Sequence, residues 1–423
     1  MKKISAILIV SLFFLGCKKT QVAMPDSSQW ALFRDGAAAP LPYATRQAME
    51  GVYDIAGNDN FGSLAALKWS YVVNGNNDTT YHISGFFGKD IAYFICEGKQ
   101  LNGQILLSGY WRKMVSTETG IIRFTIDPAN GATVLLNPSP VLPTAIILDG
   151  LFGNGQDEPK NSITLSHNRP LHNGAAPFNI LAHRGGGRNS DLLPVSENSV
   201  EMILKTAELG STGIEIDVRF TKDGIPILYH DNDINLRLTQ KSGLVGPIEN
   251  YTYAQLNAFV RLINGERIPT LRQALSAALY KTPLTFIWLD TKYIGSLERV
   301  QALQFEFMEL ATGLGRPLQI VIGLPAEAQV NMFLELPDYN ITPSLCELSL
   351  ADVERTNSMI WAPRFTEGTQ NENVAAIQAQ GKKAFVWTLD VPEFIEQFIR
   401  DGQFDGILSN FPSCVAYNYY VQQ

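Results

Sequence analysis

Acidic side chains that could share a cation occur in two apolar runs in the second half of the chain. Glu215 and Asp217 stand two residues apart in one run, and Asp290 and Lys292 repeat that spacing in a later one. Side chains at positions i and i+2 of a β-strand point to the same face. Carboxylates that converge away from water repel one another strongly unless a proton or a cation lies between them. Oxygen ligands alone favour one hard divalent cation, Ca²⁺ or Mg²⁺, over zinc.

Histidines and basic residues accompany these carboxylates. The chain has 5 histidines, and His183 and His230 each end a short apolar run. An imidazole with a pKa of about 6.5 can give and take a proton at neutral pH. Arg184 and Lys292 would place positive charge where an anionic substrate would lie. The set favours cleavage of a phosphodiester, in which one histidine activates the nucleophile and the other protonates the leaving alkoxide.

Such residues meet when they stand at the carboxyl ends of parallel strands. Buried-type runs alternate with helical patterns over residues 179–423, in about eight units, which predicts an α/β fold with a closed TIM (β/α)8 barrel. Three of the candidate strands compete for two places: Leu318–Ile322, Ile341–Leu348 and Ser358–Phe365. The other expected strands are Asn179–His183, Gly213–Val218, Pro226–His230, Leu284–Asp290, Ala384–Leu389 and Gly406–Ser409.

A different pattern precedes the barrel, over residues 49–136. Short β-branched and aromatic runs alternate with Gly, Asn and Asp turns, which indicates a small antiparallel β-barrel or sandwich. The expected strands are Leu67–Val73, Tyr81–Phe87, Ile91–Cys96, Gln104–Trp111 and Gly120–Ile126, with Thr133–Leu136 as a further candidate. The aromatic residues are expected to form the core of this domain, and a cavity for a lipid or glycan ligand is the alternative. Residues 137–178 are expected to be a linker.

The start of the chain has the features of a bacterial export signal. Two lysines precede an apolar run over residues 4–15, which is shorter than a membrane span. Phe14-Leu15-Gly16-Cys17 resembles a lipobox, with Phe where Leu is usual. We therefore expect a signal peptide over residues 1–16, a lipid on Cys17 and a tether over residues 17–48. On this interpretation the protein is an exported lipoprotein held to the membrane. Simple secretion with an incidental Cys17 is the alternative.

Charge and cysteine content exclude other classes. The formal net charge is −8, whereas binding to nucleic acid requires basic surfaces. Beyond Cys17 the chain has Cys96, Cys346 and Cys414. They are far apart and odd in number, so no disulfide framework is indicated.

The second half of the chain resembles the glycerophosphodiester phosphodiesterase family. The likeness covers about Asn179 to Pro412 and rests on an ordered set of motifs. These are His183-Arg184-Gly185, Glu197-Asn198-Ser199, Glu215-Ile216-Asp217-Val218, Thr221-Lys222-Asp223-Gly224, His230-Asp231, Ile268-Pro269-Thr270-Leu271, Val386-Trp387-Thr388 and Asp405-Gly406-Ile407.

The resemblance implies a role for each matching residue. It implies that Glu215, Asp217 and Asp290 bind the metal, that His183 and His230 form the acid–base pair, that Arg184 and Lys292 contact the phosphate, that Glu197 orients groups near His183, and that Trp387 lines the pocket. The chain departs from the family pattern at two residues. Asp290 replaces the usual Glu, and Asn410 replaces the usual Asp. The glycine-rich loop from Gly185 to Pro194 is also somewhat long.

The expected function is metal-dependent hydrolysis of a small-molecule glycerophosphodiester to an alcohol and glycerol phosphate. The first nucleophile stays open: the glycerol 2-hydroxyl could attack internally to give a cyclic phosphate, or water could attack directly. Two alternatives also stay open. One is a phospholipase or lyase that acts on intact lipids or polymer phosphodiesters. The other is a catalytically inactive lipoprotein that binds lipid or carbohydrate.

Overall fold

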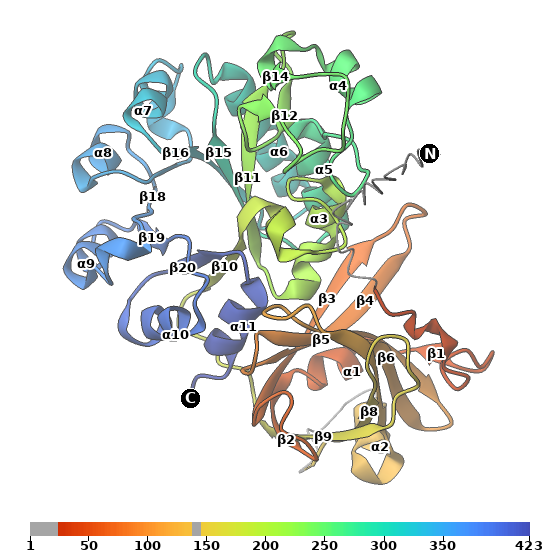
Figure 1. The fold of residues 1–423 in the computed structure, drawn as a ribbon. Helices are drawn as coiled ribbons and strands as arrows, with labels where there is room; N and C mark the ends of the chain where they lie inside the picture. Colours follow the sequence, from red (N-terminus) through yellow and green to blue (C-terminus); the bar gives the residue numbers. More distant parts are fainter. Residues whose placement is uncertain (1–23, 138–144) are drawn as a thin grey trace, which may run out of the picture.

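The computed structural model describes residues 24–137 and 145–423, which form two domains (Figure 1). The predicted signal peptide and Cys17 lie outside the described residues. Within the described part of the chain, no helix combines the length and the apolar character that a membrane span requires.

The N-terminal domain is a closed antiparallel β-barrel, one of the two forms that the strand pattern predicted. In the described residues up to 169, eight strands each pair with the next, and the last pairs with the first. They are β2 (Gly51–Ala56), β3 (Leu64–Val73), β4 (Thr79–Phe87), β5 (Ala92–Leu101), β6 (Gln104–Lys113), β7 (Thr119–Ile126), β8 (Ile147–Phe152) and β9 (Asn161–Arg169). A short strand, β1 (Ala39–Pro40), adds to β5.

Three sequence-based boundaries of this domain are wrong. Residues 137–178 are not only a linker, because β8 and β9 lie there and close the barrel. The candidate strand at Thr133–Leu136 is a short helix, α2 (Ala132–Leu135). The tether ends before residue 48, because α1 (Tyr43–Ala48) packs on the barrel and the hydroxyl of Thr45 donates to the Leu135 carbonyl at 2.6 Å. Strand β9 was not predicted because it has only two apolar side chains. These are Ile163 and Leu165, which point into the barrel and alternate with polar residues.

Aromatic rings fill the interior of the β-barrel. The ring of Phe61 lies 4.7 Å from that of Phe87 and 5.1 Å from that of Phe152, measured between centroids. Trp111 and Phe94 belong to the same buried cluster. Because successive side chains of a strand point to opposite faces, the alternate residues of these strands point outward, and several of them pack against the second domain.

The C-terminal domain is a TIM barrel, as predicted. Among the described residues, eight parallel strands close through pairing of the first with the second and the last. They are β10 (Asn179–Ala182), β11 (Gly213–Phe220), β15 (Phe286–Thr291), β16 (Gln319–Leu324), β17 (Ser344–Cys346), β18 (Ile360–Trp361), β19 (Lys383–Val386) and β20 (Gly406–Ser409). The helices lie outside this ring (Figure 1). They are α3 (Val200–Lys205), α5 (Leu271–Lys281), α6 (Glu298–Gly313), α7 (Glu327–Leu334), α8 (Leu350–Arg355), α9 (Asn371–Gln378), α10 (Pro392–Asp401) and α11 (Pro412–Tyr420).

The structure corrects one strand assignment in this barrel. The run predicted as a barrel strand at Pro226–His230 is β12 (Pro226–Leu228), which turns back and pairs antiparallel with β11. The three candidates that competed for two places are all barrel strands, β16, β17 and β18. A short apolar run has the same composition in a hairpin as in a parallel strand, so only its pairing partner distinguishes the two. His230 therefore reaches the rim from a hairpin, followed by α4 (Tyr253–Phe259) further along.

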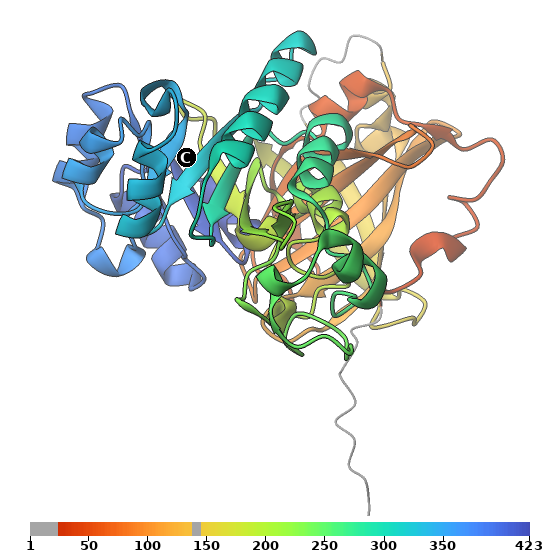
Figure 2. The ribbon, with the colours of Figure 1, turned by 90° about the horizontal axis from the view of Figure 1, so that it is seen from above.

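The two domains share a hydrophobic core. Phe86 and Tyr93 of the β-barrel pack in one buried cluster with Val415 and Ala416 of α11. The hydroxyl of Ser84 donates to the backbone carbonyl of Glu208 at 2.6 Å. Figure 2 shows the β-barrel, in orange, lying side by side with the TIM barrel.

Candidate active site

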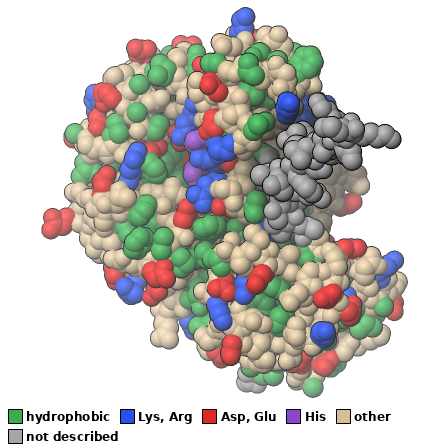
Figure 3. Space-filling model, in the orientation of Figure 1, with side chains coloured by type: hydrophobic (Ala, Val, Ile, Leu, Met, Phe, Trp, Pro, Cys, Tyr) green, Lys and Arg blue, Asp and Glu red, His purple; other side chains and the backbone are tan. Residues whose placement is uncertain are grey.

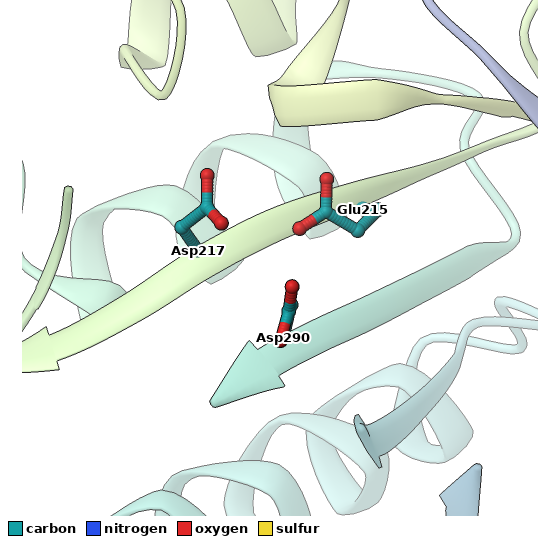
Figure 4. Close-up of side chains that lie close together, drawn as sticks. All are labelled: Glu215, Asp217 and Asp290. Atoms are coloured by element: carbon teal, nitrogen blue, oxygen red, sulfur yellow. The ribbon is translucent and has the colours of Figure 1, made fainter. Parts of the chain in front are cut away.

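Three buried carboxylates meet on two neighbouring strands of the TIM barrel (Figure 4). Glu215 and Asp217 lie on β11, and Asp290 lies on β15 directly opposite Asp217 in the strand register. One oxygen from each carboxylate lies within 4.8 Å of the others. All three side chains are buried. The structure therefore brings Asp290 to Glu215 and Asp217, which the sequence placed together on another strand.

The basic groups around the trio leave one oxygen of each carboxylate without a hydrogen bond among the described residues. Glu215 Oε1, Asp217 Oδ1 and Asp290 Oδ1 have no hydrogen-bond partner within the described ranges, and each such loss costs about 1–3 kcal/mol. Burial, reinforced by the charge of Asp217, raises the pKa of Glu215 well above its usual value. Burial also raises the pKa of Asp290, although Lys292 opposes it. A divalent cation bound by these oxygens would offset both costs, so the residues fit such an ion.

His183 and Arg184 follow β10 in a tight turn beside this trio. Arg184 adopts a left-handed backbone conformation (φ 53°), and its backbone N–H donates to Glu215 Oε2 at 2.8 Å. Nε2 of His183 lies 3.7 Å from the same oxygen. Burial, with the nearby charge of Arg184, lowers the pKa of His183 to about 4. His183 is therefore neutral at physiological pH.

The tautomer of His183 follows from the side chain of Asn410, the residue after β20, and from the Asp390 carboxylate that binds Asn410. Asn410 donates from Nδ2 to Asp390 at 2.6 Å, and its backbone N–H donates to the same carboxylate at 2.9 Å. The amide oxygen of Asn410 therefore faces Nδ1 of His183, at 2.8 Å. Because that oxygen can only accept, the proton of His183 lies on Nδ1. Nε2, which faces the carboxylates, is left with its lone pair.

His230 is held from its other side by an acidic partner. Its Nδ1 lies 2.7 Å from Asp231 Oδ1. Asp231 also accepts from Arg237 at 2.6 Å and from Asn235 at 2.7 Å. Burial works against ionisation of Asp217, but the charges of Lys292 and His230 hold its pKa below the usual value. His230 therefore acts electrostatically on the acidic trio, from the side of the site that the β11–β12 hairpin forms.

Two basic side chains complete the site. The ammonium group of Lys292 forms an ion pair with Asp290 and lies 3.6 Å from Asp217 Oδ1. Arg184 donates to Glu197 Oε1 at 2.8 Å, and its Nε lies 3.9 Å from Asp217. Glu197 is 2% exposed, and it also accepts from Arg237 at 3.3 Å. The Glu197 carboxylate thus accepts hydrogen bonds from both Arg184 and Arg237. In Figure 3, basic and histidine side chains gather at one place on the surface of this domain.

Trp387 follows β19 on the same rim. Its indole N–H donates to the Ala362 carbonyl at 2.9 Å, and the guanidinium of Arg364 lies 4.9 Å from its ring centroid. The residue is half-buried. Its ring therefore stacks with a basic side chain near the barrel mouth.

Sequence reasoning gave no role to two residues that the structure places at the site. Asn198 donates to Asp217 Oδ2 at 2.7 Å and accepts from the backbone N–H of Asp217 at 3.1 Å. Glu347 follows β17, and burial together with the charge of Asp290 raises its pKa well above the usual value. Asn198 belongs to the motif Glu197-Asn198-Ser199, and Glu347 directly follows strand β17. Their contacts depend on which strands are neighbours, which the sequence left open.

These features define a class of protein: a TIM barrel that has, at its rim, an acidic site able to bind a cation and flanked by two histidines. Residues 183–297 match the model of the Glycerophosphoryl diester phosphodiesterase family. That stretch contains the acidic trio, both histidines, Arg184, Glu197 and Lys292. The chain therefore carries a domain of this family.

Several characterised proteins are similar to the chain. Glycerophosphodiester phosphodiesterase 1 of Homo sapiens is 34% identical over 138 residues, which are 31% of this chain and 40% of that protein. The chain thus covers less than half of that relative's length. A glycerophosphodiester phosphodiesterase of Caldanaerobacter subterraneus is 27% identical over 256 residues, 55% of this chain and 94% of that protein. A glycerophosphocholine phosphodiesterase of Eremothecium gossypii is 40% identical over 91 residues, 21% of this chain and 6% of that protein.

Solved structures also align with the chain. A glycerophosphodiester phosphodiesterase from Parabacteroides distasonis aligns with a TM-score of 0.44 and 22% identity, over 56% of this chain and 95% of that chain. A phosphodiesterase from Oleispira antarctica, solved in complex with the product sn-glycerol-3-phosphate, aligns with a TM-score of 0.45 and 19% identity, over 56% and 95%.

Proposed function

We propose that the C-terminal domain hydrolyses a glycerophosphodiester to an alcohol and glycerol phosphate, with one divalent cation bound. The observation that carries this proposal is the meeting of Glu215, Asp217 and Asp290, with oxygens that have no hydrogen-bond partner in the described part of the chain, beside a neutral His183. The family membership of this domain supports the same reaction class.

The cation's place in the reaction is electrostatic. Held by the three carboxylates, Ca²⁺ or Mg²⁺ would offset the charge of the phosphate and the charge that grows on its oxygens in the transition state. The chain's own basic groups act on the same charge. Lys292 and Arg184 both stand next to the trio, so a phosphate bound there would contact both.

The two histidines divide the proton transfers. Nε2 of His183 carries a lone pair and faces the site, so we assign His183 as the base that takes the proton of the attacking nucleophile, which is either the glycerol 2-hydroxyl or water. The Nδ1–H of His230 donates to Asp231, which leaves Nε2 of His230 to exchange a proton with the substrate. We assign His230 as the acid that protonates the leaving alkoxide oxygen. In this scheme Asn410 accepts from Nδ1 of His183, and Asp231 accepts from Nδ1 of His230, so each ring keeps Nε2 for the substrate.

A substrate panel with purified protein tests this proposal. Protein lacking residues 1–17 would be incubated with Ca²⁺ or Mg²⁺ and glycerophosphocholine, and release of glycerol phosphate would be measured. We expect turnover that EDTA abolishes and that His183→Gln lowers by about 10²–10⁴-fold. Glu215→Gln is expected to weaken cation binding measured by calorimetry.

The same panel separates the alternatives. Intact phosphatidylcholine in place of the deacylated diester would reveal a phospholipase, and detection of a cyclic phosphate would reveal internal attack by the 2-hydroxyl. Absence of turnover with every diester, while calorimetry shows the cation bound, would reject the proposed activity.

We further propose that the protein is an exported lipoprotein anchored through Cys17. The basic start, the apolar run and the lipobox-like Phe14-Leu15-Gly16-Cys17 support this. Cys17→Ser is expected to move the protein from the membrane fraction to the soluble fraction and to abolish incorporation of labelled fatty acid. Unchanged fractionation of that variant would contradict the proposal.

A further inference from the structure

The glycine-rich loop between β10 and α3, residues 185–194, is built into the candidate active site. Asn189 accepts from the backbone N–H of Glu197 at 2.9 Å and donates its own N–H to the Glu197 carboxylate at 2.8 Å. Glu197 in turn holds Arg184 at 2.8 Å. The conformation of this loop therefore determines where the guanidinium of Arg184 lies.

A second connection runs from the same loop to His183. Arg188 donates to the carboxylate of Asp191 at 2.9 Å, and its Nη1 lies 3.7 Å from Asp390. Asp390 accepts from Asn410, whose amide oxygen contacts His183. Asp191 is thus linked, through Arg188, to the carboxylate that fixes the amide beside His183.

The loop is also bound from the other domain, by Arg112 of β6. Trp111 points into the β-barrel, so its neighbour Arg112 points outward, toward the TIM barrel. Nη2 of Arg112 donates to the carbonyls of Asp191 and Leu192, at 3.1 and 3.0 Å. Arg112 is fully buried. Leu192 has a left-handed backbone conformation (φ 56°), so the chain turns sharply where the two carbonyls meet the guanidinium.

We propose that Arg112 is a positioning residue, through which the β-barrel domain holds the active-site loop in place. This inference rests on the proposed function. Three consecutive glycines, Gly185 to Gly187, begin the loop, and glycine restricts the backbone less than any other residue does. The two hydrogen bonds from Arg112 act toward the opposite end, at Asp191 and Leu192. Without them the loop loses its contact with a rigid strand, and Arg188 and Asn189 lose the support that keeps them on Asp390 and Glu197.

A purely structural role for Arg112 makes a different prediction. Arg112 also lies near Tyr93 and Tyr110, and its charge acts on both phenols together with that of Glu208. If Arg112 only balances the charge of this interface, its loss changes the stability of the protein and leaves the loop unaltered. Loop mobility and catalysis measured separately from stability therefore distinguish the two roles.

The experiment compares Arg112→Met with a matched interface variant, Ser84→Ala. Both variants remove side-chain hydrogen bonds between the domains: Arg112→Met removes two to the loop, and Ser84→Ala removes one to Glu208, away from the loop. We expect Arg112→Met to accelerate amide hydrogen exchange at residues 189–193 by at least about tenfold and to lower kcat by about 10–100-fold. Ca²⁺ affinity is expected to stay unchanged, because Arg112 does not contact the acidic trio. Ser84→Ala is expected to alter none of these.

The two proposals can fail separately. Unchanged exchange of residues 189–193 in folded Arg112→Met, or equal effects of Ser84→Ala, would overturn the positioning role whatever the activity. Faster exchange confined to the loop, in a protein that hydrolyses no diester, would support the positioning role and reject the proposed reaction. Should Arg112→Met not fold, Arg112→Lys decides instead. Lysine keeps the charge but lacks the planar donor pair, so the same exchange and kcat changes are expected at smaller size.

Discussion

Asn198 forms two hydrogen bonds with Asp217, and these contacts keep the buried carboxylate in one orientation. Its side chain binds one carboxylate oxygen and the backbone N–H of Asp217, and Asn198 has a left-handed backbone conformation (φ 58°). Loss of a residue that orients a metal ligand typically lowers metal affinity by about 10–100-fold. Asparagine suits this position because its short polar side chain tolerates that conformation.

Replacement of Asn198 by glycine is expected to weaken Ca²⁺ binding by about 10–100-fold, because Asp217 loses both contacts. Glycine keeps the left-handed backbone accessible, so the change reports on the side chain. Asn357→Gly is the matched control: Asn357 is also left-handed (φ 50°), and its side chain donates to the Asn340 carbonyl on the surface. Titration calorimetry measures both. Equal affinities of the two variants would contradict the role of Asn198.

At the scale of elements, the site depends on three connections rather than on the strands alone. The turn after β10 aims the Arg184 N–H at Glu215, the β11–β12 hairpin carries His230, and the glycine-rich loop carries Arg188. Glycine is required in that loop where the backbone passes close to β20. A Cβ added at Gly187 (φ 143°) would lie 2.9 Å from Leu193 Cδ1 and 3.3 Å from the Asn410 carbonyl.

Gly187→Ala is accordingly expected to displace the loop, lowering kcat by about tenfold or more and stability by about 1–3 kcal/mol. Gly368→Ala serves as the control, because Gly368 also has a positive φ (81°) but nothing within 4 Å of the added Cβ. That control is expected to lose stability through backbone strain with kcat unchanged. Steady-state kinetics and thermal unfolding measure the two effects. A Gly187→Ala enzyme with normal kcat would show that the loop tolerates displacement.

At the scale of the whole molecule, the two barrels behave as one packed body. Phe86 and Tyr93 of the first domain and Val415 and Ala416 of the second belong to one buried cluster, and Arg169 of β9 donates to the Val421 carbonyl. Separating the domains would expose this apolar surface to water, at a cost of about 25 cal/mol per Å².

We therefore expect urea to unfold both domains in one transition, in which tryptophan fluorescence and far-ultraviolet circular dichroism coincide. Val415→Ala, within the shared cluster, is expected to lower the midpoint for both signals together, because it removes buried methyl groups at the interface. Val330→Ala changes a fully buried valine in the TIM-barrel core. It is the variant with which the change in the urea midpoint is compared. Two resolved transitions, with Val415→Ala shifting only one, would contradict a shared core.

The sequence by itself determined the features that depend on local spacing. The two-residue period placed Glu215 beside Asp217 and Asp290 beside Lys292, and the alternation of strand and helix patterns predicted the TIM barrel. The ordered motifs indicated the family, and the family match covers those between residues 183 and 297.

Only the tertiary structure decided which distant segments meet. It showed that β8 and β9 close the first barrel, that β12 pairs antiparallel with β11, and that Asn410 faces His183. It also brought Arg112 to the loop at Asp191, 79 positions along the chain. The physical reason is the same in each case: a strand's partner is chosen by closure of the whole sheet and by packing between domains, and neither leaves a periodic pattern in the segment itself.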